Sequence, residues 1–291
     1  MKTRLRGFDY VNMVVLVLVS VICIYPLWNI LAVSLSDGIY AAASKVYLIP
    51  KGLNVETYKY VLHNPRLGVS QGLWNSFAYT VVGTLVAVIL TFLTAYPLSK
   101  KRLVGRKTIM LIFVFTFVFE AGIIPNFIVY KSLGLVNSFW VMIIPNAINT
   151  FLLIIMRSFL DALPEELEES AYIDGANDLQ TMWKIYFPLA RPAIATVCVF
   201  YSVAIWNQYL VPAIYLQKQS LKPITVVLYN LIVSGSKDGT SLESIKVHGV
   251  QLLPQNLQAA AIFLSVAPIL IVYPFAQKYF TKGMLIGSVK G

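Results

Sequence analysis

The residues best suited to specific chemistry lie in an acidic segment between positions 161 and 192. It reads DALPEELEESAYIDGANDLQTMWKIYFPLARP. The carboxylates are Asp161, Glu165, Glu166, Glu168, Glu169, Asp174 and Asp178, and the nearby cations are Arg157, Lys184 and Arg191. Anionic headgroups repel such a face, and helices that lie on lipid are usually rich in Lys and Arg. The charges therefore favour a protein partner, and an interfacial helix is the alternative.

The same segment predicts two short helices joined by a turn. Pro164 suits a first helical turn, and the glutamates after it complement the positive end of the helix dipole. Gly175 suits the left-handed position just past a helix end. A second helix can begin with Asn177 or Asp178 as its N-cap and must end before Pro188. This helix carries large apolar side chains although it is not part of a membrane span. Such side chains can insert into a groove of a partner protein. These side chains are Met182, Trp183 and Ile185.

Polar residues inside the apolar runs are candidates for a substrate pathway. Glu120 is the one acidic residue well inside such a run. Burying a charge there costs at least about 2.5 kcal/mol, so the carboxylate should face a cavity or a partner. Glu120 could recognise substrate hydroxyls, form a gate contact, or serve as a structural carboxylate that is paired with an adjacent subunit or held neutral.

Amides and aromatic residues in the runs supply the other pathway candidates. Amides suit sugar hydroxyls and flat rings suit the apolar face of a sugar, but amides also hold membrane helices together. The consecutive residues 206–209 combine both types and are the best candidate for a cavity wall. The full set is Asn126, Asn146, Asn149, Trp206, Asn207, Gln208 and Tyr209.

Catalytic and metal-binding patterns are absent from the sequence. The run Gly105-Arg106-Lys107-Thr108 lacks the spacing of a loop that cradles phosphates. Only His63 and His248 occur, and both fall in predicted external loops. This excludes a histidine-rich metal site, and it leaves a nucleophile within the runs without a histidine base. We expect no catalytic residue, no metal and no cofactor in this chain.

The elements that must position these residues are membrane helices. Of the 291 residues, 58% are hydrophobic and 12% are charged, with a mean hydropathy of +0.72. A soluble domain carries roughly 25% charged residues. Six runs are long enough to span a bilayer and apolar around their whole circumference, so we expect an all-α integral membrane protein with a six-helix transmembrane bundle. The runs cover residues 11–35, 74–98, 108–130, 139–156, 193–216 and 257–275.

The net charge of +10 comes from basic clusters that flank the runs. They lie at the N-terminus, in the connector 100–107 and in the tail, which places both termini and the acidic segment in the cytoplasm. Residues 36–73 and 217–256 are then external. No basic patch interleaves with aromatics, so we expect no nucleic-acid binding. We expect three parts: residues 1–71 with the first span and an external loop, the transmembrane core 72–276, and a cytoplasmic tail 277–291.

The acidic segment resembles the EAA loop of ABC-importer permeases. Glu169-Ser170-Ala171 stands for its Glu-Ala-Ala, Gly175 for its glycine, and Ile185 with Pro188 for its Ile-x-x-Pro ending. Ser170 replaces the first alanine, a small-for-small change. The tail from Gln277 onward is similar to that of carbohydrate permeases, the class of the maltose importer. Within this class the chain looks nearest to permeases for oligosaccharides and polysaccharides, including a bacterial alginate importer.

The resemblance implies a pore subunit of an ATP-driven importer in the bacterial cytoplasmic (inner) membrane, working by alternating access. Its partners would be a second homologous permease, an ATPase dimer that binds ATP and Mg, an extracytoplasmic substrate-binding protein that contacts the loop 217–256, and a carbohydrate. The EAA helix would dock in a cleft on the ATPase. The residues implied in this coupling are Glu169, Ala171, Asp174, Gly175, Ala176, Met182, Trp183, Ile185 and Pro188.

Two other classes of membrane protein compete with this interpretation. A stand-alone secondary transporter or channel would need inverted repeats or intramembrane ion-coupling residues, and the sequence shows no repeat and only Glu120. A structural membrane scaffold would tolerate loss of the Asp174-Gly175 turn.

Overall fold

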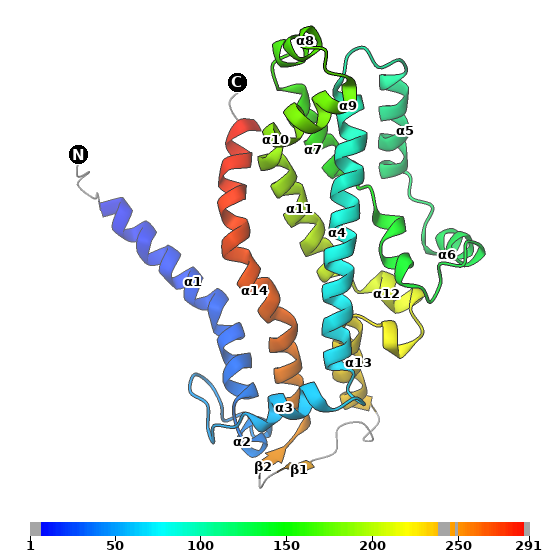
Figure 1. Ribbon diagram of the computed structural model, residues 1–291. Coiled ribbons are helices and arrows are strands. Elements are labelled where there is room, and N and C mark those ends of the chain that lie inside the picture. Colours follow the sequence, from blue (N-terminus) through cyan, green and yellow to red (C-terminus); the bar gives the residue numbers. More distant parts are fainter. Residues whose placement is uncertain (1–6, 238–244, 248–249, 288–291) are drawn as a thin grey trace. The chain divides into compact units, whose positions relative to one another are not determined.

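The computed structural model describes residues 7–237, 245–247 and 250–287, and its contacts divide the chain into two compact units. One unit holds Met1–Ser70 and Val227–Pro268, and the other holds Gln71–Val226 and Ile269–Gly291. Helices dominate both units (Figure 1). The helix α14 runs through Gly287, so the predicted tail 277–291 is helical up to that residue. Residues 288–291 lie outside the described part of the chain.

The first unit is built on two long apolar helices and short connecting elements. Its elements are α1 (Gly7–Ser34), α2 (Gly38–Ala42), α3 (Glu56–His63), most of α13 (Ile224–Lys237) and the first part of α14 (Pro254–Gly287). The buried amide of Asn256 donates to the Thr57 hydroxyl at 3.2 Å and to the Ser36 carbonyl at 3.4 Å. These bonds satisfy buried polar groups and join three segments that lie far apart in the sequence.

The first unit also contains a short antiparallel strand pair, a feature that the all-α prediction lacks. β1 (Ile245–Val247) pairs with β2 (Val250–Leu252), and each strand alternates apolar, polar and apolar residues. Alternation of this kind is typical of strands. A Cβ on Gly38 of α2 would lie 2.2 Å from the carbonyl oxygen of Gln251, so α2 can approach β2 this closely only with glycine at that position.

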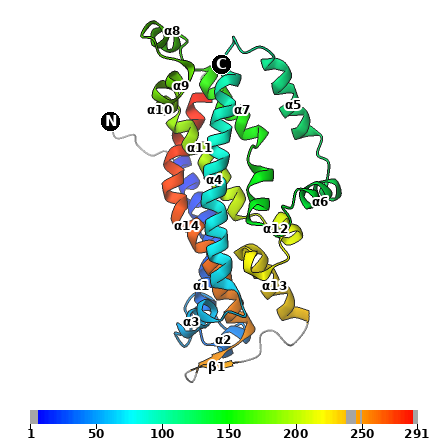
Figure 2. The ribbon, with the colours of Figure 1, turned by 45° about the vertical axis from the view of Figure 1, so that its right-hand side comes forward.

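The second unit is arranged around α4 (Val69–Ser99). Its other elements are α5 (Arg106–Val118), α6 (Ile123–Ser132), the 3₁₀ turns η1 (Phe139–Met142) and η2 (Ile144–Asn146), α7 (Thr150–Asp161), α8 (Glu166–Ile173), α9 (Asp178–Thr181), the π-helical turn η3 (Met182–Tyr186), α10 (Phe187–Leu189), α11 (Arg191–Trp206), α12 (Leu210–Tyr215) and the 3₁₀ turn η4 (Gln219–Leu221). Two views show α8, α9 and α10 at one end of α4, near the end of α7 (Figures 1 and 2).

The core of the second unit lies where α4, α7, η3 and α11 meet. Phe92 of α4, Met156 of α7 and Val197 of α11 are almost completely buried there. The buried Tyr201 hydroxyl ties the same helices together, because it bonds to Thr91 and accepts from the backbone N–H of Asn149, both at 2.8 Å. This core attaches the acidic segment to three membrane helices.

The six predicted spans are only partly continuous. Among the described residues, three helices are long and apolar enough to cross a membrane alone: Phe8–Ser34, Val69–Ser99 and Pro254–Pro274. Three helix pairs reach that length only together. They are Arg106–Val118 with Ile123–Ser132, bent by 115°, Phe139–Asn146 with Thr150–Asp161, bent by 50°, and Asp178–Leu189 with Arg191–Trp206, bent by 77°. Two of these bends fall inside the predicted runs 108–130 and 139–156, which are therefore broken helices and not continuous ones. The run 193–216 is also broken, but at a different place, between α11 and α12.

Local residues explain two of the breaks. Gly122, between α5 and α6, has a φ of 84°, a conformation that other residues rarely adopt. Pro212 interrupts the run 193–216, because a proline has no N–H to donate to the carbonyl of Gln208 four residues earlier. The Thr225 hydroxyl donates to that carbonyl instead, at 2.8 Å. A neighbouring side chain thus satisfies the freed backbone group, as a membrane helix requires.

Candidate functional site

The first helix of the acidic segment ends in a turn that backbone hydrogen bonds fix. α8 ends at Ile173, and Gly175 takes a left-handed φ of 79°. The N–H of Gly175 donates to the carbonyl of Tyr172 at 3.0 Å, and the N–H of Ala176 donates to that of Ala171 at 2.9 Å. This pair of bonds is the Schellman motif, which satisfies the last carbonyls of a helix. The predicted left-handed turn at Gly175 is confirmed.

The second helix begins with a capping box. The Asn177 side chain accepts from the N–H of Gln180 at 2.9 Å, and the Gln180 side chain accepts from the N–H of Asn177 at 3.0 Å. Asn177, rather than Asp178, is therefore the N-cap. α8 begins at Glu166, so Pro164 lies two residues before the helix and not in its first turn, where the sequence predicted it. We call the segment from α8 to α10 the elbow (Glu166–Leu189).

The sequence predicted that the second helix ends before Pro188, and this prediction is wrong. The helix continues to Leu189 through the π-helical turn η3, where the N–H of Phe187 donates to the carbonyl of Met182, five residues back. A proline inside an α-helix clashes with the preceding turn and removes a hydrogen bond. The wider π turn removes this conflict, and such turns often occur at functional sites.

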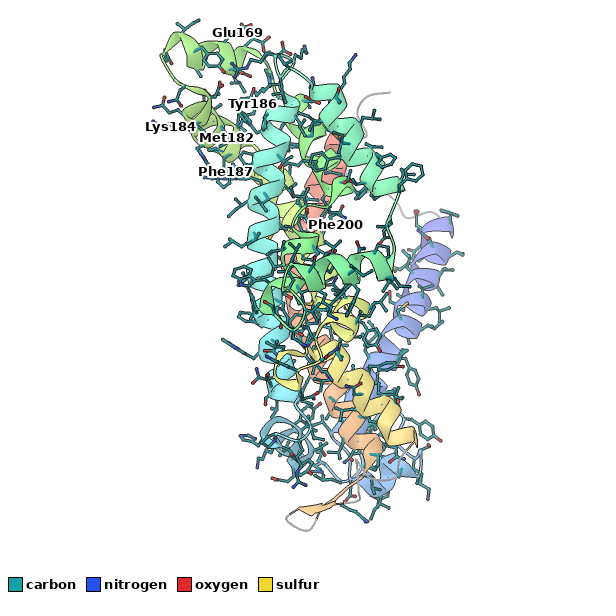
Figure 3. The ribbon with its side chains drawn as sticks, turned by 90° about the vertical axis from the view of Figure 1, so that its right-hand side faces the viewer. Glu169, Met182, Lys184, Tyr186, Phe187 and Phe200 are labelled. Atoms are coloured by element: carbon teal, nitrogen blue, oxygen red, sulfur yellow. The ribbon has the colours of Figure 1, made fainter. Side chains whose placement is uncertain are left out.

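The apolar side chains of η3 hold the elbow to its own chain. Met182 is 4% exposed and Tyr186 is 2% exposed, and both belong to the core with α4, α7 and α11 (Figure 3). Met182 therefore does not project toward a partner, which corrects the prediction. Ile185 is half-buried against the same core. Trp183 is half-exposed, with its ring centroid 5.9 Å from that of Phe92.

The most exposed apolar side chains of the elbow lie at its tip instead. Ile173 is 85% exposed and Leu179 is 67% exposed, on either side of the turn at Gly175. The sequence analysis did not single out these two residues. A signal was available, because both are large apolar residues close to the predicted turn at Gly175, where few neighbouring segments can cover a side chain. The tip is defined by Ile173 and Leu179.

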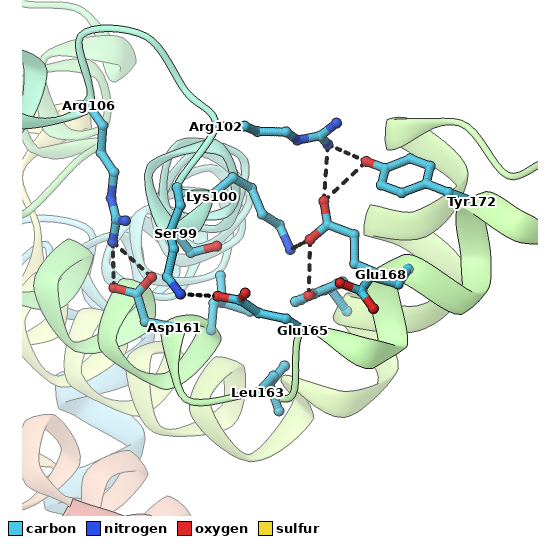
Figure 4. Close-up of a pocket in the computed structure, with 13 residues that line it drawn as sticks. Ser99, Lys100, Arg102, Arg106, Asp161, Leu163, Glu165, Glu168 and Tyr172 are labelled. Atoms are coloured by element: carbon cyan, nitrogen blue, oxygen red, sulfur yellow. Dashed lines mark hydrogen bonds and ion pairs between the residues drawn. The ribbon is translucent and has the colours of Figure 1, made fainter.

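The basic connector between α4 and α5 pairs with the elbow across an open cleft of about 480 Å³ (Figure 4). The Lys100 ammonium lies 2.5 Å from one carboxylate oxygen of Glu168, and the Arg102 guanidinium lies 3.1 Å from the other. Arg102 also donates to Asp178 at 2.5 Å. Both helices of the elbow are therefore bound to residues that directly follow α4.

Lys100 and Glu168 form the most enclosed ion pair of the cleft. Their side chains are 10% and 15% exposed, and the Lys100 ammonium lies 3.4 Å from the centroid of the Tyr186 ring. Burial lowers the pKa of Lys100, and the hydrogen bond to Glu168 opposes that effect. Removing one member of such a pair destabilises the protein, because the other charge is then buried without a counter-charge.

The remaining ion pairs of the cleft are more exposed. Lys101 pairs with Glu165, and hydrogen bonds from Tyr172 and Arg102 hold the pKa of the Asp178 carboxyl below its usual range. Exposed pairs contribute little to stability because water and salt screen them. The Lys100–Glu168 pair therefore dominates the electrostatic attachment of the elbow.

The acidic residues of the segment thus divide into two groups. Those that form ion pairs within the chain are Asp161, Glu165, Glu168 and Asp178. Glu166, Glu169 and Asp174 form no ion pair with any residue that the structure describes. The interpretation that the acidic charge as a whole serves a partner is therefore corrected, since only the second group is available for one.

The candidate substrate-pathway residues gather at the helix breaks. Glu120 is exposed between α5 and α6, which corrects its predicted place within a continuous span, and Asn126 is half-buried in α6. Asn146 ends η2, and the Asn149 side chain caps α7 by accepting from the N–H of Leu152 at 3.1 Å. Irregular backbone at membrane depth is tolerated where it is buried in protein or lines a water-filled cavity.

The run 206–209 crosses the break between α11 and α12. Trp206 is buried and Tyr209 is half-buried. The exposed Asn207 donates to the carbonyl of Val203 at 2.9 Å, so its amide closes the end of its own helix. The side-chain oxygen of Gln208 is buried and has no hydrogen-bond partner among the described residues. None of these residues lines the cleft beside the elbow, so the pathway candidates and the elbow form separate sites.

The arrangement described so far, broken apolar helices with an anchored acidic elbow, matches a known family. Residues 80–286 match the binding-protein-dependent transport system inner membrane component. The chain belongs to this family. The permease is accordingly a multi-pass membrane protein, and the matched residues include the elbow and all three bent helix pairs.

Two curated relatives and one solved structure resemble the permease over nearly their whole length. It is 41% identical over 292 residues to the "Polygalacturonan/rhamnogalacturonan transport system permease protein YtcP" of Bacillus subtilis (strain 168), with 100% of both chains covered. It is 40% identical over 288 residues to "Protein LplC" of the same organism, covering 98% of this chain and 96% of that one. A chain of a bacterial ABC transporter involved in the import of the acidic polysaccharide alginate superposes with a TM-score of 0.85 at 32% identity, covering 96% of this chain and 100% of that one.

Proposed function

We propose that this permease forms half of the translocation pathway of an ATP-driven carbohydrate importer and that its elbow docks on a separate cytoplasmic ATPase. The observation that carries the proposal is the construction of the elbow. Its tip exposes Ile173 and Leu179, while its base is packed into a core shared by three helices. The apolar tip can bind a partner, and the packed base can transmit the partner's movement to the membrane helices.

The elbow residues have three roles in the proposed coupling: they form the turn, contact the ATPase, or attach the elbow to α4. Ala171, Gly175 and Ala176 form the turn, and Asp174, the C-cap of α8, precedes it. Glu169 is exposed on α8, where it lines the cleft, and its carboxylate would be available to a cation of the ATPase. Met182 and Ile185 pack in the core, and the Trp183 ring lies beside Phe92 of α4, so these three residues of η3 would couple by holding the elbow to α4. Trp183 is half-exposed and could also contact the partner, and Pro188 follows in α10.

The mechanism proposed for the complex is alternating access. A ligand biases a two-state protein only through contacts that differ between the states. ATP and Mg bind to the partner ATPase, and closure of that ATPase dimer would move two elbows, one from this chain and one from a second homologous permease. Because Lys100 and Phe92 tie the elbow to α4, that helix moves with it.

The substrate proposed for the importer is an oligosaccharide from an acidic polysaccharide, of the kind named for YtcP and for the alginate transporter. The helix breaks around Asn149 and Gln208 are the places where this chain would line the pathway, since discontinuous helices form binding sites in transporters. An extracytoplasmic binding protein would deliver the sugar to the face opposite the elbow. Both termini would then lie in the cytoplasm.

Co-purification and uptake test this function together. The affinity-tagged permease, extracted with a mild detergent, is expected to bring an ATPase chain and a second permease with it. In proteoliposomes, uptake of an acidic oligosaccharide should require ATP inside the compartment that holds the ATPase and a binding protein on the other side. A permease that purifies alone and transports without ATP would instead be a secondary transporter, and the proposal would fail.

A further inference from the structure

A second open groove, of about 440 Å³, lies on α5 beside the end of α7. Its wall carries three cations, Arg106, Lys107 and Arg157, and its floor is formed by Met110, Leu111 and Val114. Cations at one end and apolar side chains along a membrane helix complement the phosphate headgroup and the acyl chains of a phospholipid. The cleft beside the elbow differs, because carboxylates balance its cations.

The cations of the groove have too few partners in the described part of the chain. Arg106 binds both oxygens of Asp161 at 2.9 Å, and Arg157 approaches the same carboxylate at 3.4 Å, so one anion serves two guanidinium groups. The Arg106 Nε is buried without a hydrogen bond, and the Arg157 Nε, which is the atom that approaches Asp161, forms an ion pair there without a hydrogen bond. Lys107 is exposed and forms no ion pair with a described residue. The groove is therefore positively charged.

The floor of the groove opens onto an apolar helix face. Leu111 is 67% exposed, and farther along α5 Ile112 and Phe115 are 59% and 57% exposed. α5 is the first half of a bent pair that has the length and composition of a membrane span. The cations at its start therefore lie where a span meets the headgroup region, the level at which basic pockets between membrane helices bind anionic lipids.

From this combination we infer that the groove binds the phosphate headgroup of an anionic phospholipid, with an acyl chain lying along α5. Arginine suits this ligand because its planar fork matches phosphate oxygens in a bidentate manner. A free phosphate would use the cations and leave the apolar floor uncovered. A protein partner with a carboxylate would cover the groove in the assembled complex and displace lipid from it.

Competition between lipids tests the inference. The full transporter is purified in detergent, supplied with equal amounts of dioleoyl phosphatidylglycerol and dioleoyl phosphatidylethanolamine, and examined by native mass spectrometry. We expect selective retention of phosphatidylglycerol. The double variant Lys107→Gln/Arg157→Gln should weaken that binding about thirtyfold, since each cation near a membrane surface contributes a factor of about five.

A matched control separates the groove from a general effect of charge. The variant Lys184→Gln/Arg191→Gln also removes one lysine and one arginine, both exposed and on the elbow side of the chain. It should retain phosphatidylglycerol as the unmodified protein does. Equal losses in the two double variants, or no loss in either, would overturn the inference.

A substitution that is expected to strengthen lipid binding, and not weaken it, keeps the test informative if the first variant folds poorly. Asp161→Asn removes the carboxylate shared by the two arginines and should tighten phosphatidylglycerol binding several-fold. Weaker or unchanged binding would count against the groove. In a parallel arm, inorganic phosphate replaces the lipid, and thermal protection as strong as that by phosphatidylglycerol would assign the cations to a soluble anion instead.

Discussion

Replacing Gly175 with valine is expected to abolish transport while the transporter complex still assembles. Gly175 has a φ of 79°, and a Cβ there would meet no atom within 4 Å. The substitution therefore introduces backbone strain without a clash. An L-residue in the left-handed region costs roughly 1–2 kcal/mol, and a β-branched residue is a genuine outlier there. The Schellman turn would open, and the tip would lose its orientation toward the ATPase.

Gly175→Asn is the matched control for this prediction, because asparagine tolerates the left-handed conformation. Uptake into proteoliposomes should be close to normal in the asparagine variant and at least about tenfold lower in the valine variant, since 1.4 kcal/mol corresponds to a tenfold change. Co-purification of the ATPase establishes that both variants assemble. Normal uptake by Gly175→Val would contradict the role of the elbow as a rigid lever.

Removing one member of the Lys100–Glu168 pair is expected to produce the second large effect. Lys100→Met leaves the Glu168 carboxylate 15% exposed and without its closest cation. Breaking a buried pair in this way is strongly destabilising, on the order of 2–3 kcal/mol at this partial exposure. The elbow would detach from α4, so unfolding in mixed micelles should occur at lower denaturant and transport should fall.

The double variant Lys100→Met/Glu168→Leu should recover much of that loss, because well-packed apolar residues can replace a buried ion pair. A double-mutant cycle is expected to give a coupling energy of about 1–3 kcal/mol. The exposed pair of Lys101 and Glu165 supplies the control, and Lys101→Met should leave stability nearly unchanged. Additive effects at Lys100 and Glu168 would show that the pair does not attach the elbow.

The local structure of the elbow was accessible from sequence because its signals act over a few residues. Gly175 predicts a left-handed helix end, and Asn177 predicts a cap, whatever surrounds them. The family pattern depends on the same local features. The apolar runs likewise predicted membrane helices, because the requirement for about 20 apolar residues is a property of the segment alone.

The parts that sequence analysis missed depend on contacts between distant segments. Met182 was expected to project, but its burial depends on α4, which lies far from it in the sequence. The partner of Glu168 is Lys100, 68 positions away, so the acidic segment alone gave no sign of that pair. The break near Pro212 likewise depends on Thr225, which satisfies the freed carbonyl of Gln208 from 17 positions away.

Cross-linking at the tip of the elbow tests the central claim most directly. In a Cys23→Ser/Cys198→Ser background, Leu179→Cys and, as a control, Leu53→Cys place single thiols at side chains that are 67% and 78% exposed. With a short bifunctional thiol reagent, Leu179→Cys in the assembled, transporting complex should cross-link to the ATPase chain. Leu53→Cys should not, and it should react with a membrane-impermeant maleimide added outside intact cells. A tip thiol that reacts with the external maleimide, or that stays free of the ATPase in a working complex, would contradict the account.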